Sequence, residues 1–242
     1  ELYLDSAYMV SVPYGMHLRF DNDPVRVVNS NLLLENFNMY AHNDNPLNIY
    51  GNVNFADLNQ IRLSLKMRAR NYLLIDAKKA PKAVAYGKAY VNFFANVNGD
   101  LDNLQMRGSL DVLGNTDMTY VLRDSPLNTD DQLKGLVTFT NFNDTTTHVE
   151  AARPPINGLD MLLMMNVESG ARVKCALNAD QSNYVDLEGG GELRMLYNAA
   201  DELQLYGRYT INSGEMKYAL PIIPLKTFQL QQGSYIEFKG DI

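Results

Sequence analysis

Apolar and polar residues alternate along many short segments of this chain. In the last fifth, Leu203, Leu205, Tyr209 and Ile211 occupy every second position around a central Gly207, and mostly polar residues fill the places between them. A period of two, interrupted by Gly, Asn, Ser or Asp, predicts antiparallel strands with one dry and one wet face. The function therefore depends on what the dry face contacts.

The same type of strand recurs upstream. Residues 47–55, 104–112 and 203–211 each hold five alternate positions that are apolar except for a central glycine. The second and third copies are each followed by a tight turn and another alternating segment. Residues 61–67 and 91–97 add further rows of the same kind. The pattern predicts an all-β chain, built as an elongated sheet in which antiparallel pairs dominate.

Alternation is lost between residues 123 and 157, where Asp, Asn, Thr and Pro gather. A stretch of this kind is typical of a long excursion or linker. We therefore expect three parts: a β-groove segment at 1–122, an irregular segment at 123–157, and a C-terminal β-groove segment at 158–242. The two β segments are expected to form one continuous sheet.

Charge narrows the possible partners. The formal net charge is −7 and the isoelectric point is about 5.0. Binding to nucleic acid or to a membrane surface through charge requires clustered Lys and Arg. The excess of acidic residues argues against both kinds of binding, and we expect no nucleic-acid partner.

Residue types that commonly carry catalysis are scattered. His17, His42 and His148 show no paired spacing, so we interpret them as solvated strand or turn residues. Cys175 is the only cysteine, which excludes an internal disulfide. The glycines at 189–191 lack the lysine of a phosphate-binding loop. We expect no enzymatic activity, no metal site and no cofactor.

Several short motifs near the C-terminus occur together. They are Gly207-Arg208-Tyr209, Gly214-Glu215 with Tyr218, Pro224-Leu225-Lys226-Thr227-Phe228, and Gly233-Ser234-Tyr235-Ile236-Glu237-Phe238 with Gly240-Asp241. In these motifs the chain resembles the C-terminal domain of the TamB family, the AsmA-like translocation and assembly module proteins, and especially its Bacteroidetes branch. The likeness is sharp over 104–122 and 158–241.

The resemblance implies a fold and a function. TamB and AsmA proteins are understood as long, curled sheets with a hydrophobic interior, a β-taco that is an open groove or is partly closed like a barrel. The implied function is phospholipid transport between the inner and outer membranes, which supports outer-membrane integrity. The alternative is an assembly module that docks a BamA-family, TamA-like outer-membrane barrel for protein secretion and outer-membrane protein biogenesis.

The resemblance also implies a location. We expect the periplasm of a Gram-negative bacterium, in association with the outer membrane. Because the chain starts at Glu1 without a basic leader, we expect a piece of a longer protein that is anchored in the inner membrane.

A groove has a physical purpose, because moving an acyl chain into water costs about 0.8 kcal/mol per CH₂, on the order of 20 kcal/mol for two chains. We expect the phospholipid acyl chains to contact the residues of the alternating rows: Ile49, Val53, Ile61, Leu63, Leu65, Met67, Phe93, Leu104, Met106, Leu110, Val112, Leu193, Met195, Leu203, Leu205, Tyr209, Ile211, Met216, Tyr218, Phe228, Leu230, Ile236 and Phe238. We expect the last strand to offer its edge to a barrel partner, through Ser234, Tyr235, Ile236, Glu237 and Phe238.

Two other readings of the pattern stay open. The apolar rows could simply form the filled core of a sandwich or small barrel, with no ligand. A transmembrane β-barrel alternates in the same way. The absence of Trp and the presence of Pro221 and Pro224 argue against the membrane barrel.

Overall fold

The chain folds into one all-β sheet, as the alternation predicted. The computed structural model describes residues 7–11, 14–21, 23–80, 83–122, 158–198, 202–218 and 226–241. These residues contain fourteen strands and no helix. The predicted irregular segment at 123–157 lies outside the described residues, so the division into three parts stays a prediction.

The strands differ widely in length, from three residues in β3 to eighteen in β10. Their bounds are β1 (Tyr8–Ser11), β2 (Met16–Phe20), β3 (Arg26–Val28), β4 (Asn31–Tyr40), β5 (Pro46–Asn54), β6 (Arg62–Ala77), β7 (Ala85–Asp100), β8 (Asn103–Val112), β9 (Asp117–Val121), β10 (Leu159–Ala176), β11 (Tyr184–Asn198), β12 (Glu202–Tyr218), β13 (Lys226–Gln229) and β14 (Tyr235–Asp241).

Most strands that are neighbours in the sheet are also consecutive in the sequence. The order is β1-β2-β4-β5-β6-β7-β8-β10-β11-β12-β13, and three further strands pair beside this path. The strands β2 and β3 share one edge of β4, and β13 and β14 share one edge of β12. The strands β8 and β9 both fill the space between β7 and β10, so the pairings of these four strands form a small closed ring.

Only β10 departs from antiparallel pairing among the described strands. It runs parallel to β8, with Leu159 opposite Leu104 and Val167 opposite Val112, and parallel to β9. A parallel pair requires a long connection, and the chain makes one between β9 and β10. This pairing joins the two halves of the sequence into one sheet.

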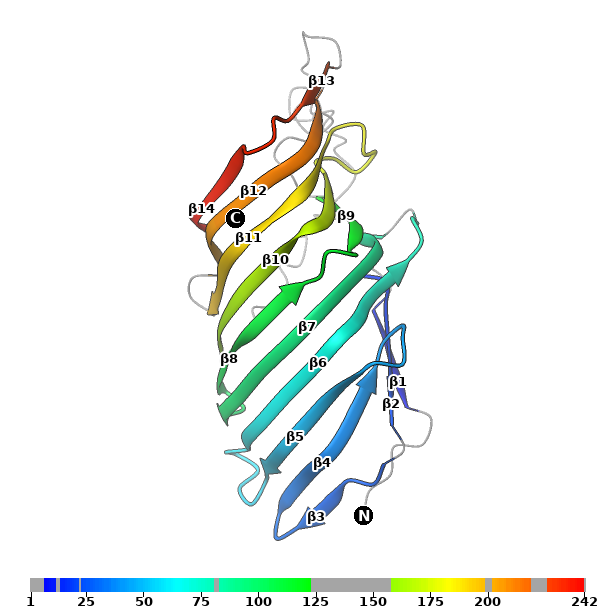
Figure 1. Cartoon of the computed structure of the whole chain (residues 1–242). Coiled ribbons are helices and arrows are strands. Elements are labelled where there is room, and N and C mark those ends of the chain that lie inside the picture. The colour runs from blue at the N-terminus through cyan, green and yellow to red at the C-terminus, as the bar shows by residue number, and fades with distance from the viewer. Residues whose placement is uncertain are drawn as a thin grey trace, which may run out of the picture.

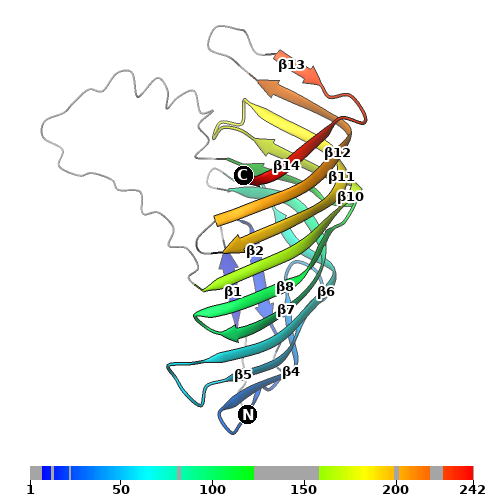
Figure 2. The same cartoon turned by 90° about the vertical axis from the view of Figure 1, so that its left-hand side faces the viewer.

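The sheet is curled. Figure 1 shows the strands stacked obliquely from β4 to β12, and Figure 2 shows the same strands bending around one side. Register shifts interrupt the ladders of the long strands, including those between Ala69 and Tyr72 in β6 and between Val167 and Ala171 in β10. Such bulges bend a strand and increase its twist, so they account for part of the curl.

The N-terminal hairpin lies inside the curl. It pairs with β4 only at Arg19 and Phe20, and then β1 and β2 pass along the inner side of the sheet (Figure 2). There Leu18 packs in one buried cluster with Ala69, Tyr72 and Val91. The face that carries these residues is therefore the concave one.

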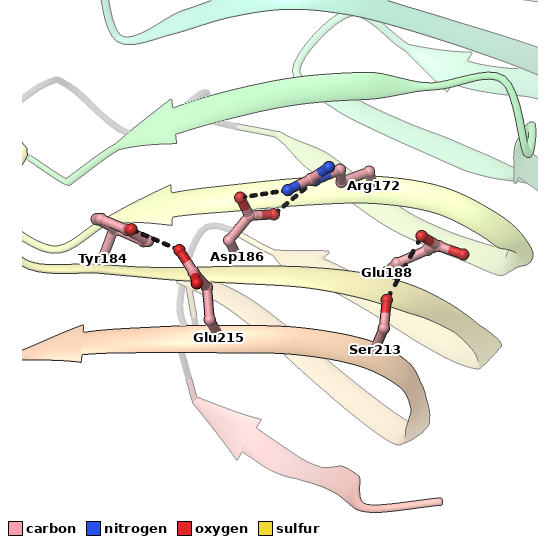
Figure 3. Close-up of polar contacts among 6 residues, drawn as sticks. All are labelled: Arg172, Tyr184, Asp186, Glu188, Ser213 and Glu215. Carbon is pink, nitrogen blue, oxygen red and sulfur yellow. Dashed lines mark hydrogen bonds and ion pairs between the residues drawn. The ribbon is translucent and has the colours of Figure 1, made fainter. Parts of the chain in front are cut away.

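Polar groups tie the strands β10, β11 and β12 together (Figure 3). They lie on the opposite, convex face, because they alternate with residues such as Ala171 and Leu187, which pack in the C-terminal buried cluster. Arg172 of β10 donates two hydrogen bonds to Asp186 of β11, Nε to Oδ1 at 2.9 Å and Nη2 to Oδ2 at 3.0 Å. These hydrogen bonds raise the pKa of Arg172 above its usual range. The Tyr184 hydroxyl donates to Glu215 Oε1 at 2.6 Å, which raises the pKa of Tyr184. The contacts link β10, β11 and β12.

Glycine is required where strands bend closely against each other. Gly207 has φ +122°, and a Cβ built there would lie 2.5 Å from the carbonyl oxygen of Glu192. Gly233 has φ +84°, but a Cβ built there would meet no atom within 4 Å. Both positions strain an L side chain, whereas only Gly207 also has a steric reason to be glycine.

We predict that Gly207→Ala lowers the free energy of unfolding by about 3 kcal/mol, because backbone strain and overpacking add. Gly233→Ala should lower it by only about 1 kcal/mol, from strain alone. Urea unfolding of both variants and of the unmodified chain measures the difference. Equal losses in the two variants would contradict the close packing of β11 on β12.

Candidate functional site

Strand register places apolar residues in unbroken rows across the sheet. Residues directly opposite each other in paired strands point to the same face. We define the concave apolar face by three such rows that start on β4 and continue at least to β12. They are Leu34, Gly51, Leu65, Val97, Met106, Met161, Tyr197 and Leu203; Phe37, Ile49, Met67, Ala95, Gly108, Leu163, Met195 and Leu205; and Met39, Leu47, Ala69, Phe93, Leu110, Met165, Leu193, Gly207 and Phe238.

The two faces of the sheet differ sharply in charge. The three rows contain apolar residues, glycine and one tyrosine, with no Asp, Glu, Lys or Arg. The alternate positions point outward, as along β6, where Arg62, Lys66 and Arg68 are exposed. The concave apolar face is therefore suited to hydrocarbon and offers no counter-charge to an anion.

Much of the concave apolar face is only half-buried. Leu63, Leu65 and Met67 on β6 are all of intermediate exposure, although they alternate with exposed polar residues. A sandwich core would bury such side chains completely. In the described part of the chain the sheet curls without covering this face throughout.

Two buried clusters interrupt the half-buried rows. The first lies under the N-terminal hairpin and includes Leu18 and Val91. The second lies near the C-terminus and includes Val167, Leu193 and Tyr209. A further row connects them, because Val91 pairs with Val112, which pairs with Val167. The face is thus dry at these two places and partly open between and beyond them.

Most of the predicted groove residues share the concave face. Those that strand register or packing places there are Ile49, Val53, Leu63, Leu65, Met67, Phe93, Leu104, Met106, Leu110, Val112, Leu193, Met195, Leu203, Leu205, Tyr209, Ile211, Met216, Leu230, Ile236 and Phe238. Their contact with lipid stays a prediction.

The remaining three predicted residues lie at the margins. Ile61 precedes β6 and stands outside the rows. Tyr218 is the last residue of β12, and Phe228 lies on the short strand β13. Phe228 pairs with Met216 and therefore points to the same face, but it is 52 % exposed and lies at the margin of that face.

Sequence reasoning missed the contribution of β10. Met161, Leu163, Met165 and Val167 all lie in the cross-strand rows. Their alternation is blurred because the neighbours that point outward, including Met164, are apolar as well. The period of two is nevertheless present at the odd positions, and it is the signal that could have identified the strand.

The predicted partner edge lies on β14, apart from Ser234, which immediately precedes the strand. This strand pairs with β12, and no other described strand pairs with it. Its residues divide between the two faces. Ile236 and Phe238 pack against the C-terminal cluster, whereas Tyr235 is exposed and stacks with the Arg208 guanidinium, 4.1 Å from the ring centre. Hydrogen bonding to Lys239 lowers the pKa of Glu237.

Candidate reactive groups do not converge in the described part of the chain. His17 stacks on Tyr8, and His42 Nε2 lies 2.9 Å from the Gly15 carbonyl oxygen. His148 lies outside the described residues. Cys175 is half-buried, and burial raises the pKa of its thiol, which disfavours the reactive thiolate. No group of three His, Cys, Asp or Glu side chains gathers among the described residues to hold a metal.

None of the described residues forms a helix that is long and apolar enough to span a membrane. Comparison with curated proteins and with solved structures finds no significant match. A family model, that of the TamB C-terminal domain, matches residues 35–242. This range includes residues 35–40 of β4 and every later strand, and therefore the whole concave apolar face apart from Leu34. The chain belongs to the TamB C-terminal domain family of envelope proteins.

Proposed function

We propose that the concave apolar face is a hydrophobic groove for phospholipid acyl chains. The chain would then form the C-terminal part of a periplasmic bridge that carries phospholipid between the inner and outer membranes and supports outer-membrane integrity. The observation that carries this proposal is the set of unbroken, uncharged rows from β4 to β12 and β14.

The energetics favour a hydrocarbon ligand. Half-buried Leu and Met side chains leave apolar surface in water, at a cost of about 25 cal/mol per Å². An acyl chain that covers these side chains removes that cost and its own exposure, about 0.8 kcal/mol per CH₂. A continuous row lets the chain move without leaving apolar contact.

The charge distribution separates acyl chains from headgroups. A phosphate group binds Arg, Lys or backbone N–H groups, and the three rows carry no cation. The charged side chains of β6, among them Arg62 and Lys66, point to the convex face. The headgroup would therefore remain in water, at the open side of the curl.

The length of the rows fits more than one lipid. From β4 to β14 there are nine strand positions. Eight spacings of about 4.8 Å give about 38 Å. One leaflet of a bilayer has about 15 Å of hydrocarbon, so the rows are long enough for two lipids placed one after the other.

We predict that Leu65→Glu reduces co-purifying phospholipid at least about tenfold, because a carboxylate on the groove wall must be desolvated against an acyl chain. Lys66→Glu is the matched control, since its side chain points to the convex face, and it should leave the lipid content unchanged. Quantitative mass spectrometry of extracted lipid measures both. Leu65 is only half-buried, so thermal unfolding should show that both variants are folded. Equal lipid content in the two variants would contradict the proposal.

The open edge of β14 supports a second candidate function. A strand with one unpaired edge can accept a further strand from a partner by β-augmentation. We propose docking to a BamA-family outer-membrane barrel at this edge, in protein secretion or outer-membrane protein biogenesis.

Deletion of residues 233–242 should abolish capture of a purified BamA-family barrel, because it removes the pairing edge. Leu65→Glu should leave this capture unchanged, since the substitution lies far along the sheet. A pull-down with both variants separates the two functions. Capture that survives the deletion would count against docking through β14.

A further inference from the structure

Two tyrosine hydroxyls are buried without a hydrogen-bond partner in the described part of the chain. They belong to Tyr72, which is 3 % exposed, and to Tyr209, which is 7 % exposed. Buried hydroxyl groups in native proteins nearly always have a partner, because the unmade bond costs stability. Two such groups on one face require an explanation.

The two tyrosines lie in the same cross-strand row. Tyr72 of β6 pairs with Val91, and the row continues through Val112 and Val167 to Gly191. A Cβ built on Gly191 would lie 3.1 Å from the Tyr209 Cα, so Tyr209 of β12 is the next member. Five strand spacings of about 4.8 Å separate the two tyrosines by about 24 Å.

The chemistry around these hydroxyls selects a neutral acceptor. Burial raises the pKa of Tyr72 to about 12. Burial, and then the nearby Glu188 carboxylate, raise the pKa of Tyr209 to about 12. Both groups are therefore neutral donors at physiological pH. The buried clusters that hold them are otherwise apolar, and the Glu188 charge would repel an anion at Tyr209.

We propose that Tyr72 and Tyr209 each donate a hydrogen bond to an ester carbonyl oxygen of a diacyl lipid whose chains lie on the concave apolar face. This inference rests on the proposed groove. An ester carbonyl is the polar atom nearest the acyl chains, it is uncharged, and it only accepts hydrogen bonds. The two tyrosines would be two hydrogen-bonding sites along the path of the lipid.

Side chains from the N-terminal hairpin and the C-terminal segment pack in or against the clusters that hold the two tyrosines. Leu18 of the N-terminal hairpin packs in the cluster of Tyr72. Leu230 and Ile236, from the C-terminal segment, pack against the cluster of Tyr209. The lipid carbonyl would reach each tyrosine hydroxyl by displacing these side chains. The lipid would then supply the hydrogen-bond acceptor that each hydroxyl lacks.

The test compares two lipids that differ only in the carbonyl. The chain is mixed with equal amounts of dioleoyl phosphatidylethanolamine and its di-O-oleyl ether analogue, and native mass spectrometry measures the occupancy of each. The unmodified chain should favour the ester by about tenfold, the effect of one hydrogen bond. The double variant Tyr72→Phe/Tyr209→Phe should lose this preference and still bind the ether lipid.

Tyr184→Phe is the control, because its hydroxyl is bonded to Glu215 on the convex face, and it should keep the ester preference. The tyrosine-to-phenylalanine double variant should unfold at an equal or higher temperature, since it removes two unpartnered hydroxyls. Equal binding of ester and ether by the unmodified chain, or equal losses of both in the double variant, would overturn the assignment and leave the groove intact. If the unmodified chain bound neither lipid, both the tyrosine assignment and the proposed groove would be overturned.

Discussion

Strand register is the constraint on which the rest of this structure depends. Side chains alternate between the two faces of a strand, so a slip of one residue exchanges the faces. Such a slip in β6 would replace Leu63, Leu65 and Met67 on the concave apolar face with polar or charged residues. The register of the parallel pair β8 and β10 places the apolar residues of the two halves of the sequence on the same face.

Register and curl together produce a surface that is apolar, uncharged and only partly buried. A flat sheet would expose this face completely, whereas a closed sandwich would bury it and leave no room for a ligand. The curl shelters the rows, and the hairpin and the C-terminal strands bury them at two places. A long apolar ligand can use the surface between and beyond those places. The unpartnered hydroxyls of Tyr72 and Tyr209 lie within the two buried clusters.

The sequence predicted the strands that alternate cleanly, and it could not predict long-range pairings. Leu63, Leu65 and Met67 were identified because polar residues separate them. Alternation continued from these residues would place Asn71 on the concave face, but the bulge after Ala69 brings Tyr72 there. The return of the hairpin over the sheet and the parallel pairing of β10 depend on contacts between distant residues. Local periodicity contains no signal for either.

Site-specific photocrosslinking tests the central claim most directly. A photoreactive amino acid at Leu65 or Leu110 lies on the concave apolar face, and the same group at the adjacent Lys66 or Ser109 lies on the convex face. After irradiation of the protein with envelope phospholipid, mass spectrometry should find phospholipid adducts at Leu65 and Leu110 and none at Lys66 and Ser109. Equal adduct formation on both faces, or none on the concave face, would contradict a lipid-binding groove.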